Sequence, residues 1–164
     1  MGTIAEVKIK FSGFLDVGSF YQTIIDFLDS NGFSFKEKKF KYKETENSFS
    51  VETEIEFKKE YEKDIKVEGK IELKIEDAED IVIKKGNLTK KLQKVGNLEI
   101  KIKADYIDEY GKDIEGQLNK ILLEIYKNTL AKQHFKNIEK KAKEEMKELI
   151  KEIKKQMNLH KYIY

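Results

Sequence analysis

The side chains best suited to chemistry are few in this chain. His134 and His160 are its only histidines, and neither has a second histidine at the helical spacing that would build a metal-binding face. The chain contains no cysteine, which excludes disulfides, thiolate nucleophiles and cysteine-based zinc or iron–sulfur sites. We therefore expect each histidine to be solvated or to serve in packing, and we expect neither a metal nor a cofactor.

The acidic stretch "DYIDEYGKDIE" comes nearest to a cation site. It gathers Asp105, Asp108, Glu109, Asp113 and Glu115, but it lacks the alternating oxygen ligands and the sixth-place glycine of a calcium loop. Acidic residues also collect before helices because the helix dipole favours them there. No histidine stands beside a serine or aspartate in a recognisable catalytic pattern. The sequence therefore predicts no catalytic residues and no enzymatic activity.

Charge is abundant in the 164 residues and almost balanced. The 33 basic residues, all of them lysine, face 31 acidic ones, and the net charge is +2. Arginine supplies the planar fork that grips phosphates and guanine edges, so a chain without arginine is poorly equipped to read a nucleic-acid sequence. The weak net charge also gives little attraction to a polyanion. We expect no specific nucleic-acid partner.

Two further sequence patterns bear on where in the cell the protein resides. The start "MGTIAEVKIKF" lacks the basic region and apolar run of a signal peptide. The longest uncharged run, residues 17–25, is far shorter than the roughly 18–20 apolar residues that span a bilayer. We expect a cytoplasmic protein.

The hydrophobic period divides the chain into strands and helices. Residues 17–30 place apolar side chains on one helical stripe, with Asp16 or Ser19 available as N-cap and Gly32 just after the end. Elsewhere, alternation predicts seven strands with one wet face each, and its phase slips at "KEKK", which indicates a bulge. These strands are expected at residues 3–11, 33–43, 48–58, 64–76, 80–85, 88–92 and 98–106, with Gly86-Asn87 as a hairpin turn.

From residue 112 to residue 157 the period is helical, and no glycine beyond Gly116 and no proline interrupts it. A continuous helix of this length spans roughly 69 Å and overhangs a domain that is about 35 Å across. Its apolar stripes differ in direction by roughly 120° between the first half, near Leu118 and Leu122, and the second half, near Met146 and Leu149. The helix is therefore either straight, with its second stripe turned away from the body, or broken near "AKQHF"; the lack of a breaker favours the straight helix.

One strand, one helix, six strands and a long C-terminal helix is an order that resembles the START-like (SRPBCC) superfamily of helix-grip proteins. The resemblance covers residues 3–131 and implies an α+β fold in which a curved antiparallel sheet grips the C-terminal helix around an apolar ligand. It also implies a cavity between sheet and helix. The lining side chains would be Phe49, Val51, Ile71, Leu73, Ile100 and Ile102, closed by Leu118, Leu122 and Tyr126.

Residues 132–164 form a lysine-rich helical extension to this domain of residues 1–131. Its apolar spacings suit packing against another helix, and glutamates three residues before lysines dilute its positive field. We expect self-association or docking of a protein partner, ahead of packing back on its own domain, with a membrane or nucleic-acid surface last. The predicted interaction residues are Phe135, Ile138, Ala142, Met146, Leu149, Ile153 and Met157. The predicted function is a non-catalytic assembly or interaction protein, and the alternative is a module that binds a small apolar ligand.

Overall fold

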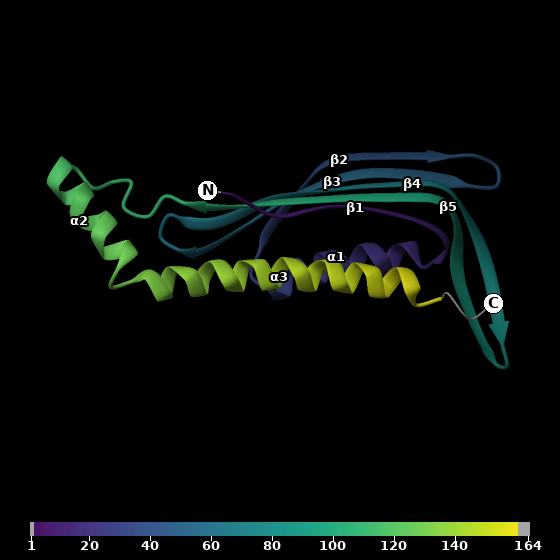
Figure 1. The fold of residues 1–164 in the computed structure, drawn as a ribbon. Coiled ribbons are helices and arrows are strands. Elements are labelled where there is room, and N and C mark those ends of the chain that lie inside the picture. Colours follow the sequence, from purple (N-terminus) through teal and green to yellow (C-terminus); the bar gives the residue numbers. More distant parts are fainter. Residues whose placement is uncertain (1, 161–164) are drawn as a thin grey trace.

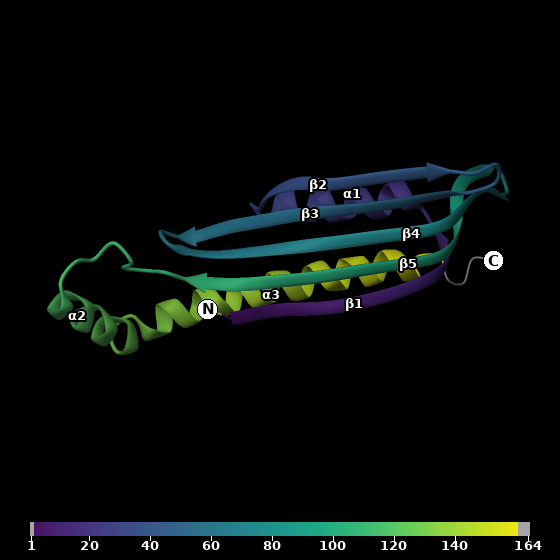
Figure 2. The ribbon, with the colours of Figure 1, turned by 90° about the horizontal axis from the view of Figure 1, so that it is seen from above.

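The computed structural model describes residues 2–160, the side chain of Lys85 excepted, and shows an antiparallel sheet with helices against one face (Figures 1 and 2). Its strand order is β1-β5-β4-β3-β2. Within these residues the α+β class is confirmed, but the sheet has five strands where seven were predicted. The elements are β1 (Gly2–Leu15), α1 (Val17–Ser30), β2 (Ser34–Glu44), β3 (Phe49–Glu62), β4 (Ile65–Lys85), β5 (Leu88–Asp108), α2 (Gln117–Asn128) and α3 (Lys132–Asn158).

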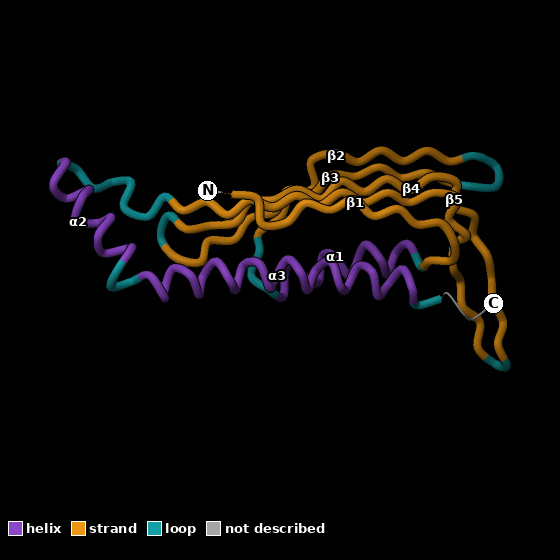
Figure 3. Tube along the Cα trace, in the orientation of Figure 1, coloured by secondary structure: helices purple, strands orange, loops and turns teal. Residues whose placement is uncertain are grey.

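The overcount arises in β4 and β5, each of which was predicted as two strands. The alternation is interrupted near Asp77 and Gly96, but the ladder of paired residues resumes beyond them, with Ala78 opposite Val95. Asp77 has a φ of 55°, and a Cβ on Gly96 would lie 2.9 Å from the Asp77 Cβ, so the two strands approach closely where they bend. Beyond this bend the hairpin leaves the sheet and turns toward the helices as an arm (Figures 1 and 3).

Alternation gives the sheet two unlike faces. In the central strands, inward residues such as Ile71 and Ile102 pair with each other and are buried. Their neighbours Lys70 and Lys103 point to the opposite face, as the two-residue period of a strand requires. The phase slip predicted in β2 is confirmed, because the register with β3 shifts between Glu37 and Lys39.

Helix α1 occupies the residues predicted for it. The Asp16 carboxylate accepts a hydrogen bond from the Ser19 amide at 3.1 Å, which satisfies one of the free N–H groups of the first turn. Three apolar side chains four residues apart, Phe20, Ile24 and Leu28, form its buried stripe. Because i and i+4 lie on one helical face, this spacing turns them all toward the sheet.

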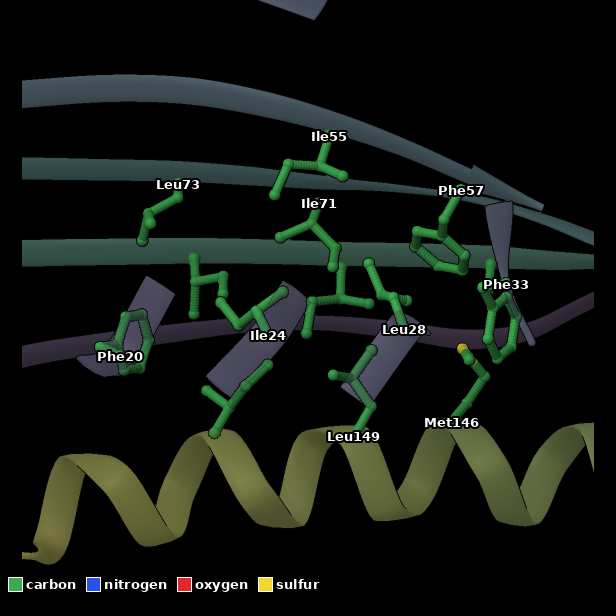
Figure 4. Close-up of a cluster of buried hydrophobic side chains, with 14 of the residues drawn as sticks. Phe20, Ile24, Leu28, Phe33, Ile55, Phe57, Ile71, Leu73, Met146 and Leu149 are labelled. Atoms are coloured by element: carbon green, nitrogen blue, oxygen red, sulfur yellow. The ribbon is translucent and has the colours of Figure 1, made fainter. Parts of the chain in front are cut away.

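Helix α3 completes the core beside α1 (Figures 1 and 4). It packs against β1, β5 and α1, and Met146 and Leu149 lie among the buried side chains of the sheet and α1. The prediction that this helix turns its apolar stripe away from its own sheet is therefore wrong. The buried side chains of α3 are Ala142, Met146, Leu149, Ile153 and Met157.

The prediction of one straight C-terminal helix is also wrong. Helix α2 ends at Asn128 and α3 begins at Lys132, with Thr129 at a ψ of −77° between them. After this break α3 packs its own stripe into the core, while no residue of α2 is buried. The expected extension thus enters the same core as the sheet, although residues 161–164 of it, like residue 1 of the preceding domain, lie outside the described residues.

Among residues 2–160 we find no helix whose length and apolar character would let it cross a membrane.

Candidate interaction surface

Helix α2 projects beyond the ends of the strands, at the opposite end of the molecule from the β4–β5 arm (Figures 1 and 2). None of its residues is buried. Five of its large apolar side chains are nevertheless more than 40% exposed. They are Leu118 (69%), Ile121 (51%), Leu122 (54%), Ile125 (53%) and Tyr126 (43%), continued past the helix end by Leu130 (85%). We call these six residues the α2 stripe.

The α2 stripe follows the spacing of a helix that buries one face. At 100° per residue, Leu118, Leu122 and Ile125 fall within about 60° of one another. Lys120 and Glu124 lie on the opposite side of the helix by the same reckoning. A surface helix normally turns such a stripe to the core of its own domain, and here the stripe faces solvent.

Helix α2 is held to the body by its polar side. The Lys127 Nζ lies 3.0 Å from the Asp108 Oδ1 at the end of β5, and both side chains are more than three-quarters buried. The same ammonium lies 5.4 Å from the ring centre of Phe135 on α3 and 5.9 Å from that of Tyr110. The two rings meet edge to face at 5.1 Å. This cluster fixes the angle between α2 and α3.

One apolar side chain of α2 faces the body. Leu123 lies over Gly111, where a Cβ would stand only 2.0 Å from the Leu123 Cδ2. Gly111 has a φ of 83°, a conformation that glycine adopts without strain. The close approach and the backbone conformation both require glycine, and they seat α2 with its stripe outward.

The residues predicted to line a cavity are divided by the structure. Ile71, Leu73, Ile100 and Ile102 lie in the hydrophobic core with side chains of α1 and α3 (Figure 4 labels Ile71 and Leu73). Phe49 and Val51 are half-buried at the start of β3. Leu118, Leu122 and Tyr126 were expected to close that cavity, but they lie on α2, away from the sheet. Helix α3 covers the sheet in their place.

The predicted interaction residues of α3 are likewise placed in or beside the core. Five of them are buried, and Phe135 and Ile138 are half-buried against the same cluster. They are brought together on one face as the spacing predicted, but the surface that they cover belongs to their own chain. The stripe that remains exposed is the one on α2.

A separate ion pair joins α3 to the sheet. The Lys59 Nζ on β3 lies 2.9 Å from one carboxylate oxygen of Glu145, and the Tyr61 hydroxyl donates to the other at 3.0 Å. The ammonium also lies 4.7 Å from the centre of the Tyr61 ring. Burial, reinforced by the charge of Glu145, raises the pKa of Tyr61, so this hydroxyl stays a donor at neutral pH. The cluster has the chemistry of a structural tie, since each charge has its counter-charge.

The outer face of the sheet holds a wide hollow of about 1200 Å³ lined by charged side chains of both signs. Lys70 lies within 3.1 Å of both Glu54 and Glu72 there. Charges paired across and along strands in this way leave little net field to attract an ion or a polyanion. We interpret this face as a solvated ladder.

The residues singled out for cation binding are dispersed among lysines. Asp108 lies 3.0 Å from the Lys127 Nζ, and Glu109 lies 3.5 Å from the Lys112 Nζ. Asp113 lies 3.9 Å from the Lys63 Nζ. Within residues 2–160, no three His, Asp or Glu side chains are grouped so that they could hold a metal ion. Among the acidic residues described here, the structure therefore gives no arrangement that resembles a metal centre.

The two histidines differ in environment. His134 is exposed and forms a hydrogen bond with Glu62. His160 is 2% exposed, and its Nδ1 has no hydrogen-bond partner among the described residues. Burial, followed by the nearby charge of Lys90, lowers the pKa of His160 below its ordinary value of 6.5. The neutral ring is therefore the form that the fold holds.

Sequence reasoning found the α2 stripe but assigned it to the wrong surface, and it did not include Leu130. The signal for Leu130 was available, because an apolar residue four positions after Tyr126 extends the stripe. The sequence analysis favoured a straight helix over a break near "AKQHF", and the structure shows a break between Asn128 and Lys132.

Comparisons of this chain with protein-family models, with curated proteins and with solved structures find no match.

Proposed function

We propose that this chain is a non-catalytic assembly or interaction protein that docks a protein partner on the α2 stripe. The observation that carries the proposal is the exposure of five large apolar side chains on α2 and of Leu130 just past its end, while Lys127 and Leu123 attach the helix to the body. Leaving such a stripe in water forgoes roughly 25 cal/mol for each Å² of apolar surface that a partner would cover. The fold serves to hold α2 at one end of the molecule, free for contact.

A protein partner fits this helix better than a membrane surface. Interfacial helices that bind lipid carry lysines or arginines along their polar face, whereas α2 places Glu124 between Lys120 and Lys127. Lys127 is in addition paired with Asp108. The remaining charge is too small to add much attraction to anionic lipid.

The alternative function, binding of a small apolar ligand between sheet and helix, is not favoured by a specific contact. Helix α3 covers the sheet where Leu118, Leu122 and Tyr126 were expected, and its Met146 and Leu149 belong to the same core cluster as Ile71.

Photo-crosslinking in cells that express the chain tests the proposal. A benzophenone side chain at Leu122 is expected to form adducts with protein, and the same group at Glu124 on the opposite side of α2 is the matched control. Preferential protein adducts at position 122 support docking on the stripe. Adducts with lipid alone, or equal yields at the two positions, contradict it.

A further inference from the structure

We propose that the α2 stripe is covered by the α2 stripe of a second copy of this chain, in an antiparallel pair around a two-fold axis near Leu122. This inference rests on the function proposed above and names the partner. It follows from the area of the stripe, from the charges at the two ends of α2 and from the place of α2 in the molecule.

The area of the stripe is suited to a small symmetric interface. At the exposures given above, its six side chains present roughly 600 Å², if a whole large side chain presents about 150–200 Å². Two copies would then bury roughly 1200 Å², the lower end of the range for specific protein interfaces. The roughly 600 Å² on one chain equals the upper limit of the largest apolar patch on a typical monomer, which is about 300–600 Å².

The charges at the ends of α2 are complementary in an antiparallel pair. Asp113 and Glu115 precede the helix, and Lys132 and Lys136 follow it in the first turns of α3; all four are exposed. When two α2 helices run in opposite directions, the acidic residues before one helix lie beside the lysines after the other. This contact occurs twice in each dimer. A parallel pair would instead place lysines beside lysines, which is unfavourable.

The direction also suits the helix dipoles, since antiparallel neighbours place the positive end of one beside the negative end of the other. In both views α2 stands clear of the sheet at one end of the body (Figures 1 and 2). A two-fold axis through α2 can therefore place the two bodies on opposite sides of the contact. An isologous pair of this kind closes on itself and leaves no second stripe exposed.

Sedimentation equilibrium of the full chain tests the pair. Between about 1 µM and about 500 µM the mean mass is expected to rise from 19.3 kDa toward twice that value. Leu122→Glu, which puts two carboxylates beside the axis, is expected to raise the dissociation constant about 30-fold or more. Lys120→Glu, on the opposite side of α2, is the matched control and is expected to leave it within about threefold. Circular dichroism verifies that both variants remain folded.

A charge exchange tests the antiparallel direction. Glu115→Lys and Lys132→Glu are each expected to weaken the dimer about three- to tenfold, because each apposes like charges. The double variant restores both opposite-charge contacts and is expected to return to within about threefold of the original dissociation constant. Additive weakening in the double variant would overturn the antiparallel pair.

The absence of cysteine allows an independent test by disulfide formation. Leu122→Cys, near the axis, is expected to form a covalent dimer under mild oxidation, whereas Lys120→Cys is expected to remain largely monomeric. A chain that stays monomeric at the highest concentration, with no cross-link at position 122, overturns self-pairing. The docking proposal would then still be decided by the adducts formed in cells, where another protein attached at position 122 supports it.

Discussion

Helices α2 and α3 follow one another with only residues 129–131 between them, yet they differ in how much of their apolar face is buried. Helix α3 buries five side chains against the sheet and α1. Helix α2 buries none and turns an equally regular stripe to solvent. Amphipathic spacing shows that a helical face will be covered, but it does not show by which surface. In this chain the sheet and α1 cover the stripe of α3, while the stripe of α2 remains exposed.

The largest expected difference between the helices is in the cost of shortening one leucine. Leu149→Ala on α3 removes a fully buried side chain and is expected to lower the free energy of unfolding by about 2–5 kcal/mol. Leu122→Ala on α2 is expected to change it by less than about 0.5 kcal/mol. Urea unfolding at a concentration where the chain is monomeric measures both. Equal losses would remove the distinction between the helices.

The tie between α3 and β3 is expected to contribute the next largest effect. Glu145→Gln leaves the Lys59 ammonium, whose side chain is 16% exposed, without its carboxylate. The expected loss in the free energy of unfolding is about 1–3 kcal/mol. Glu144→Gln is the matched control, because that neighbouring side chain is exposed and should cost less than about 0.5 kcal/mol. If the two variants unfold alike, Glu145 does not hold α3 to the sheet.

The tie that holds α2 is expected to act locally. Asp108→Asn removes the carboxylate that the Lys127 ammonium contacts at 3.0 Å. Because α2 lies outside the core, the global free energy of unfolding should fall by less than about 1 kcal/mol, while amide exchange within α2 accelerates. Hydrogen exchange read by mass spectrometry separates the two effects. Faster exchange in α3 as well would show that the helices are one cooperative unit.

The smallest effect is a pH dependence at the end of α3. His160 has a lowered pKa in the folded chain, so the unfolded chain binds a proton first as the pH falls through 6.5. The contribution of His160 to the free energy of unfolding should therefore be fully present above about pH 7.5 and smaller near pH 5.5. His160→Gln should flatten this part of the profile, measured by urea unfolding at each pH. A stability that rises as the pH falls would contradict the assignment.

Local patterns predicted the local structure well. The bounds of α1, the slip in β2 and the turn at Gly86 followed from capping, phase and turn chemistry within a few residues. The predicted strand ends near Asp77 were wrong. The alternation of apolar side chains stops at a bend there, but the pairing of β4 with β5 continues beyond it. Periodicity reports side-chain direction, so it cannot separate a bent strand from two strands.

The candidate surface was harder to predict, for a different reason. The difference in direction between the two apolar stripes was visible in the sequence. The helix breaks between them at residues 129–131, which contain neither glycine nor proline. The break is held by long-range contacts, those of Lys127 with Asp108 and of Tyr110 with Phe135. Neither pair can be found from helical spacing, because the partners come from different elements. The pattern therefore led to the wrong prediction, with the first stripe on the sheet and the second turned away, whereas the structure buries the second and exposes the first.

Hydrogen exchange of the unmodified chain at two protein concentrations tests the contrast between α2 and α3 most directly. Amides of α3 are expected to exchange slowly at both concentrations, since the helix belongs to the core. Amides of α2 are expected to exchange fast in dilute solution and to gain protection at high concentration, where the stripes meet. Concentration-independent exchange in α2, together with exchange of α3 at the same rate, would contradict the division between a core helix and a docking helix.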